Sequence, residues 1–158
     1  MIEAALQALA DWSVAAALRR PGAVYPLLNA THIFSIALIV GAATTLDLRL
    51  LGLFRAHPLG ALGPPLSRMA AVGVLFALIS GFLLFLVQPA AYASNSAFRI
   101  KLVLVAAGIA NALIVRGLPH WPRALAGGEV SLALKLSALL SLLIWACALV
   151  AGRWIAFV

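Results

Sequence analysis

Four long apolar runs, separated by short polar or Gly/Pro-rich connections, dominate the pattern of the chain. They lie at about 23–46, 68–88, 98–116 and 132–153. A helix rises about 1.5 Å per residue, so roughly 20 apolar residues cross the ~30 Å hydrocarbon core of a bilayer. The pattern therefore predicts an all-α, polytopic membrane protein. Its short connections favour an up-down bundle of four transmembrane helices in a single membrane domain, residues 1–158.

The start of the chain has a different pattern. Polar side chains recur every four residues at Glu3, Gln7 and Asp11, while apolar residues lie mostly on the other side of a helix. This pattern predicts an amphipathic helix over residues 1–20 that lies along the membrane interface. A secretory signal begins with basic residues, whereas the first charged residue here is acidic. A frayed polar tail is the alternative.

Small polar residues next to the apolar runs predict where the helices begin. Ser and Asn favour helix N-caps because their side-chain oxygens accept backbone N–H groups. The candidate caps are Ser67 for the second run, Asn95 or Ser96 for the third, and Ser131 for the fourth. The segment before Ser67 is predicted as a loop because it holds the helix breakers Gly60, Gly63, Pro64 and Pro65.

Composition supports a membrane protein and argues against an enzyme. Hydrophobic residues make up 65% of the chain and charged residues 9%, whereas soluble domains carry roughly 25% charged residues. Only four residues are acidic, and we find no nucleophile–base pair or phosphate-binding loop. The net charge is +7, but the basic residues are scattered, which suits lipid headgroups and not nucleic acid. The one cysteine, Cys147, excludes a disulfide within the chain.

The distribution of Lys and Arg gives a weak orientation signal. Six lie near the first and third connections: Arg49, Arg55, Arg68, Arg116, Arg123 and Lys135. Five lie on the opposite side: Arg19, Arg20, Arg99, Lys101 and Arg153. Because cytoplasmic loops carry the excess of basic residues, both termini are predicted to face outward.

His32 is the histidine that lies inside an apolar run. When the four runs are aligned by depth, small or aromatic residues fall at its level: Ser80, Gly81, Gly108, Ser141 and Trp145. Ionisable residues inside a membrane usually face the bundle interior. The glycines would let a flat group or another backbone approach closely.

Three interpretations of His32 remain open at this point. It joins helices through a hydrogen bond, it ligates the iron of a b-type haem, or it relays protons or contacts a small substrate. His57 and His120 lie in connections at the other face of the membrane. A haem would therefore have one axial ligand here, or a second His32 from a twofold-related copy.

A second polar cluster is predicted at the inner face. Asp47 and Arg49 close the first run, and Arg116 ends the third run at the same level. Asp47 and Arg116 could form a half-buried pair that fixes helix orientation, or a gate or a point where protons enter. Asn111 lies nearby and is typical of hydrogen bonds between membrane helices.

With these residues, the chain resembles a family of small four-helix bacterial inner-membrane proteins without an established activity. The resemblance rests on His32, on the stretches Asp47-Leu48-Arg49-Leu50-Leu51-Gly52, Ala97-Phe98-Arg99-Ile100-Lys101 and Asn111-Ala112-Leu113, and on Gly152-Arg153. The chain is also loosely similar to the membrane part of copper-resistance D proteins and to b-type cytochromes. The resemblance implies an inner-membrane bundle that covers most of the chain.

The leading functional hypothesis is a non-enzymatic inner-membrane module for electron transfer, with haem b held by His32. The alternatives are a small transporter or proton-linked module, with a polar path from His32 towards Asn111 and Asp47, and a structural or accessory subunit of a membrane complex. Expected partners are the lipid bilayer and either further copies of the chain or a larger membrane complex.

Overall fold

Four long helices form the body of the molecule. The computed structural model describes residues 1–157, which contain helices and no strand. The long helices are α3 (Val24–Leu51), α4 (Leu59–Phe85), α6 (Ser96–Gly117) and α8 (Leu132–Trp154). Each is long and apolar enough to cross a membrane. The prediction of an all-helical protein with four such segments is confirmed.

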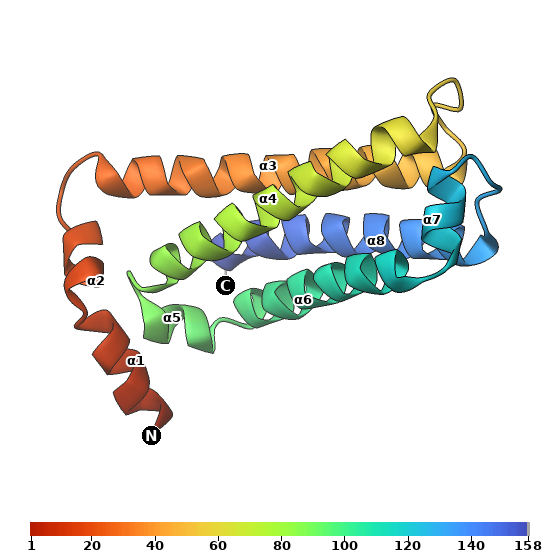
Figure 1. Cartoon of the computed structure of the whole chain (residues 1–158). Helices are drawn as coiled ribbons and strands as arrows, with labels where there is room; N and C mark the ends of the chain where they lie inside the picture. Colours follow the sequence, from red (N-terminus) through yellow and green to blue (C-terminus); the bar gives the residue numbers. More distant parts are fainter. Residues whose placement is uncertain (158) are drawn as a thin grey trace.

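Short helices lie at the two ends of the long ones (Figure 1). At one end, here called the terminal end, are α1 (Ile2–Ala10), α2 (Ser13–Leu18) and α5 (Pro89–Ser94). At the other, the α7 end, α7 (His120–Leu125) lies beside the connection between α3 and α4. A 3-10 turn, Ile155–Phe157, follows α8.

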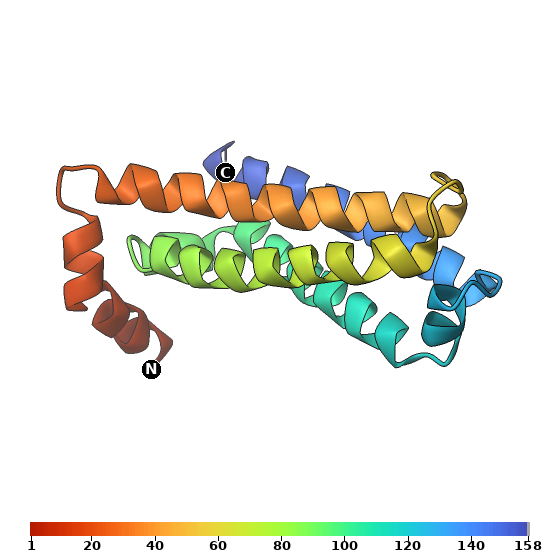
Figure 2. The same cartoon turned by 45° about the horizontal axis from the view of Figure 1, so that its top comes forward.

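The long helices pack as two pairs. α3 packs most extensively on α4, α6 packs on α8, and the contact of α3 with α8 joins the pairs. A Cβ on Gly73 of α4 would come within 2.9 Å of the Ile39 side chain and 3.0 Å of the Ser35 carbonyl, so the close α3–α4 approach requires a glycine. α4 and α6 have few close contacts, and Figure 2 shows α6 running away from α4 towards the α7 end.

The outward faces of the long helices are apolar. Phe34, Leu143 and Ile114 are 65%, 62% and 64% exposed, as are many other large apolar side chains. Soluble monomers rarely expose apolar patches above a few hundred Å². These surfaces and the four long helices are those of a multi-pass membrane protein.

α3 extends beyond its predicted end at residue 46 and keeps Asp47 and Arg49 within the helix. It ends in a Schellman motif: the Gly52 N–H donates to the Arg49 carbonyl, and the Leu53 N–H to the Leu48 carbonyl at 2.9 Å. Gly52 has φ 106, a conformation that favours glycine. The helix therefore stops at the first residue that adopts this turn without strain.

α4 begins earlier than predicted, and Ser67 is not its cap. Pro64 and Pro65 lie inside the helix, although proline removes a backbone hydrogen bond. The start of α4 packs tightly on α7, where a Cβ on Gly60 would lie 2.5 Å from the Leu125 carbonyl oxygen. Tertiary packing thus overrides the local breaker signal. The other predicted caps are present, because the side chains of Asn95 and Ser131 accept backbone N–H groups at 3.0 Å and 3.4 Å.

The N-terminal region forms two helices where one was predicted over residues 1–20. The chain becomes extended at Trp12, with ψ 140, between α1 and α2. The Arg19 guanidinium donates to the carbonyl of Ala10, the last residue of α1, and at 3.3 Å to that of Val87. Arg19 therefore satisfies a free carbonyl at the end of α1 and ties the bend to the segment after α4.

Candidate functional site: a polar cavity near the α7 end

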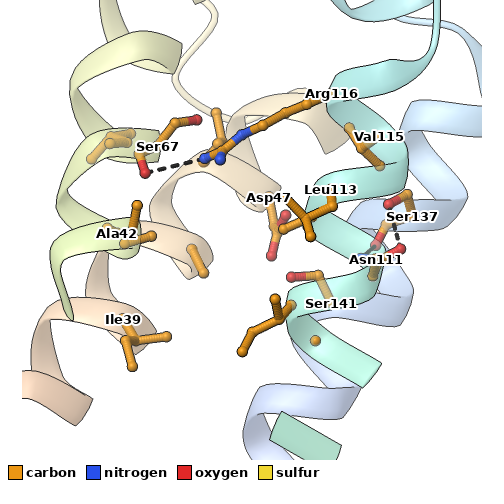
Figure 3. Close-up of a pocket in the computed structure, with 18 of the residues that line it drawn as sticks. Ile39, Ala42, Asp47, Ser67, Asn111, Leu113, Val115, Arg116, Ser137 and Ser141 are labelled. Carbon is orange, nitrogen blue, oxygen red and sulfur yellow. Dashed lines mark hydrogen bonds between the residues drawn. The ribbon is translucent and has the colours of Figure 1, made fainter. Parts of the chain in front are cut away.

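A cavity of about 210 Å³ lies between α3, α4, α6 and α8 in the half of the molecule near α7 (Figure 3). At about 30 Å³ per molecule, it has room for roughly seven waters. Most of its lining is apolar. Its polar and aromatic lining residues are Asp47, Ser67, Asn111, Arg116, Ser137, Ser141, Trp121 and Trp145.

Asp47 is the one acidic residue among those that line the cavity. Its side chain is buried, with 7% exposed, and Ser141 of α8 also lines the cavity. Figure 3 shows the two side chains turned towards each other from α3 and α8. The second carboxylate oxygen, Oδ2, has no hydrogen-bond partner within residues 1–157. A buried carboxylate is costly unless it holds a proton or faces a cation, and Asp47 has an acceptor free for either.

Ser67 supplies a second unpartnered atom. Its Oγ is buried and makes no hydrogen bond to any described residue. Its backbone carbonyl accepts a hydrogen bond of 3.1 Å from Arg116 Nη2. This bond links α4 to α6, two helices that otherwise have few close contacts. Two of the residues that line the cavity, one from α3 and one from α4, therefore each hold a buried oxygen without a partner among the described residues.

Asn111 and Ser137 form the polar part of the opposite wall. Asn111 Nδ2 donates to the Ser137 carbonyl at 3.1 Å, and Ser137 Oγ donates to Asn111 Oδ1 at 2.8 Å. The two bonds join α6 to α8. Both polar atoms of the Asn111 side chain are thus used in hydrogen bonds to α8. Asp47 and Ser67, in contrast, each keep an atom without a hydrogen-bond partner among the described residues.

The predicted inner cluster of Asp47, Arg49, Asn111 and Arg116 is divided in the structure. Asp47, Asn111 and Arg116 line the cavity, but Arg49 lies outside it and donates to the His57 carbonyl at 2.8 Å. Arg116 donates to Ser67 rather than to Asp47. The suggested Asp47–Arg116 pair is not formed, because Arg116 reaches α4.

His32 lies in the other half of α3, towards the terminal end, and does not line the cavity. Its Nδ1 is 2.9 Å from Ser80 Oγ of α4. Ser80 donates its own proton to the Phe76 carbonyl at 2.6 Å, so its oxygen accepts the proton of Nδ1. A Cβ on Gly81 would lie 3.0 Å from His32 Cε1. The ring therefore packs directly against the α4 backbone.

The residues predicted to lie at the depth of His32 fall into two separate groups in the structure. His32, Ser80 and Gly81 meet where α3 contacts α4. Gly108 and Trp145 meet where α6 contacts α8, since a Cβ on Gly108 would lie 2.9 Å from Trp145 Cζ2. The imidazole fills the space beside one glycine and the indole fills the space beside the other, so these residues do not fit a haem. Within residues 1–157 no group of three His, Cys, Asp or Glu side chains is placed to hold a metal ion.

Among the polar and aromatic residues of the cavity wall, sequence reasoning did not assign Ser67, Trp121 and Ser137 to a site. Ser67 was predicted only as a helix cap, because the segment before it was predicted as a loop. A usable signal was the spacing of Gly60 and Gly63, which lie one helical turn apart and let α7 approach closely.

Comparison with known proteins adds no relative. No family model, curated protein or solved structure matches the chain. The resemblance seen in the sequence stays a prediction, and the function has to be inferred from the cavity itself.

Proposed function

We propose that the protein is a small proton-linked transport module and that the cavity near the α7 end is its binding site. The observation that carries the proposal is the buried carboxylate of Asp47, a residue that lines the cavity and whose Oδ2 has no partner among the described residues. Ionisable residues within membrane helices are costly and usually serve ion, proton or substrate pathways. A structural role alone would leave this oxygen unexplained.

In this proposal, Asp47 exchanges a proton for a charged solute. In this proposal the Ser141 hydroxyl, which is turned towards Asp47 in Figure 3, donates to the carboxyl group in both states. The weak packing of α4 on α6 supports access to the site. These helices are held near it by the bond from Arg116 to Ser67, which can break without disturbing either helix.

The proposal also includes the membrane in which the protein lies, its topology and its orientation. The four long helices cross a bacterial inner membrane as an up-down bundle with both termini periplasmic, and α1 and α2 lie along the interface. Trp12, at the bend between α1 and α2, is 48% exposed, as suits an interfacial aromatic residue. Fusions of alkaline phosphatase and of green fluorescent protein to the C-terminus test the orientation. Phosphatase activity without fluorescence is expected, and the reverse result contradicts it.

Proton movement in proteoliposomes tests the function. The purified protein is reconstituted with a pH-sensitive dye inside, and small amines, amino acids and carboxylic acids are added in turn. At least one class is expected to drive proton movement. Asp47→Asn should abolish this movement, because an amide cannot take up the proton.

The matched control is His32→Gln, which changes a polar group inside α3 but outside the cavity. This variant should keep the flux. The proposal fails when no solute class moves protons, or when the Asp47→Asn protein performs like the unchanged one.

A further inference from the structure

We infer that the solute is a small zwitterion with an ammonium group and a carboxylate, of the amino-acid type; this inference rests on the proposed function of the same cavity. Two charged residues line the cavity, the acidic Asp47 and the basic Arg116. Asp47 and Arg116 do not pair with each other, because Arg116 donates to the Ser67 carbonyl and Asp47 Oδ2 has no hydrogen-bond partner among the described residues. The arrangement therefore offers one site for a positive group and one for a negative group.

The positive group is expected at Asp47. Its Oδ2 is an acceptor without a hydrogen-bond partner among the described residues. The indoles of Trp121 and Trp145 also line the cavity. Aromatic faces attract cations, most strongly when both are removed from water. An ammonium group would give Asp47 the charged partner that a buried carboxylate requires.

The negative group is expected at Arg116. A guanidinium has five N–H donors in a planar fork that matches a carboxylate. One bond, to the Ser67 carbonyl, ties Arg116 to the wall. Ser67 also lines the cavity, and its hydroxyl, which has no partner among the described residues, is proposed as a second donor for the same carboxylate.

Charge balance favours a zwitterion over a simple ion. A cation alone would satisfy Asp47 but leave a second positive charge at Arg116, and an anion alone would leave the Asp47 carboxylate without a partner. The volume of about 210 Å³ lies below the roughly 300–1,000 Å³ of sites for drug-sized ligands. Apolar walls such as Ile39, Val74 and Leu113 leave room for a small apolar side chain.

Three small probes that differ in charge separate the alternatives. Alanine carries both charges, ethylamine carries the ammonium group alone, and propionate carries the carboxylate alone. Binding to the full chain in detergent is measured by equilibrium dialysis with labelled probes. Loss of one charge-assisted interaction should weaken binding by about tenfold or more, so both single-charge probes should bind at least tenfold more weakly than alanine.

Variants of the chain test the two ends of the site. Asp47→Asn and Arg116→Gln should each weaken alanine binding by about tenfold or more. Arg49→Gln is the matched control, because Arg49 is basic and near the same end but does not line the cavity. Ser67→Ala removes a hydroxyl that has no partner, so it should leave folding intact and still weaken alanine binding severalfold.

The failure of this inference can be distinguished from that of the proposed function. The inference is overturned if ethylamine binds as tightly as alanine and Arg116→Gln has no effect. It is also overturned if alanine does not bind, or binds equally well to the Asp47→Asn and Ser67→Ala proteins. In either case, Asp47-dependent proton movement in proteoliposomes would leave the proposed function standing.

Discussion

Replacing Asp47 by asparagine should stabilise the empty protein, although the substitution removes a charge from the proposed site. The carboxylate is 7% exposed and Oδ2 has no partner among the described residues. A buried polar group without a partner costs about 1–3 kcal/mol, and an ionised one costs more. An amide keeps the shape of the side chain and carries no charge.

The expected gain is therefore about 1–3 kcal/mol in the free energy of unfolding at a pH high enough for the empty site to have lost its proton. For a chain of this size, each kcal/mol raises Tm by roughly 2–4 °C. The assay is thermal denaturation in detergent, without added solute, followed by helical circular dichroism. The gain should shrink in acid, because a protonated carboxyl group is neutral like the amide.

The control is Asp11→Asn, which makes the same chemical change at an exposed carboxylate that accepts from the Gln7 side chain. It should change Tm little. A lower or unchanged Tm for Asp47→Asn at that pH would refute the reasoning, because it would mean that the ionised carboxylate is satisfied in the empty protein.

Three further predictions concern the helix contacts and His32. Gly73→Ala should destabilise the protein by about 1–3 kcal/mol in thermal denaturation because its Cβ would clash with α3; Gly41→Ala, with nothing within 4 Å, should instead be neutral or stabilising by up to about 1 kcal/mol, and equal effects would contradict the packing described. Ser80→Ala should cost about 1 kcal/mol by the same assay, because His32 Nδ1 loses its acceptor; an unchanged Tm would show that this bond contributes nothing. Protein from haem-replete cells should show no Soret band in its absorption spectrum, and a band lost in His32→Ala would restore the haem hypothesis.

The hydrophobic pattern was enough to locate the long helices, because a membrane-spanning helix requires a long, nearly uninterrupted run of apolar residues. It was not enough for the start of α4. Pro64 and Pro65 are strong local breakers, and only the packing of Gly60 on α7 explains why the helix includes them. That contact joins segments distant in the chain, so no local pattern records it.

The candidate site, too, could be predicted from the sequence only in part. Helical rise gives the depth of a side chain, so Ser80 and Gly81 were correctly placed level with His32. Depth does not say which helices form pairs, and Trp145 belongs to the other pair. Asp47 could be singled out as an acidic residue in an apolar setting, but its free oxygen depends on where the Arg116 side chain reaches, which sequence does not specify.

The loose contact between α4 and α6 gives the bilayer itself a structural part in this protein. These helices diverge towards the α7 end, and their exposed side chains there are apolar, as Val72 and Ile114 illustrate. In a membrane, acyl chains complete the packing that the two helices do not provide for each other. Lipid between α4 and α6 then borders the cavity and can be displaced, and the thickness and fluidity of the bilayer determine how easily it is displaced.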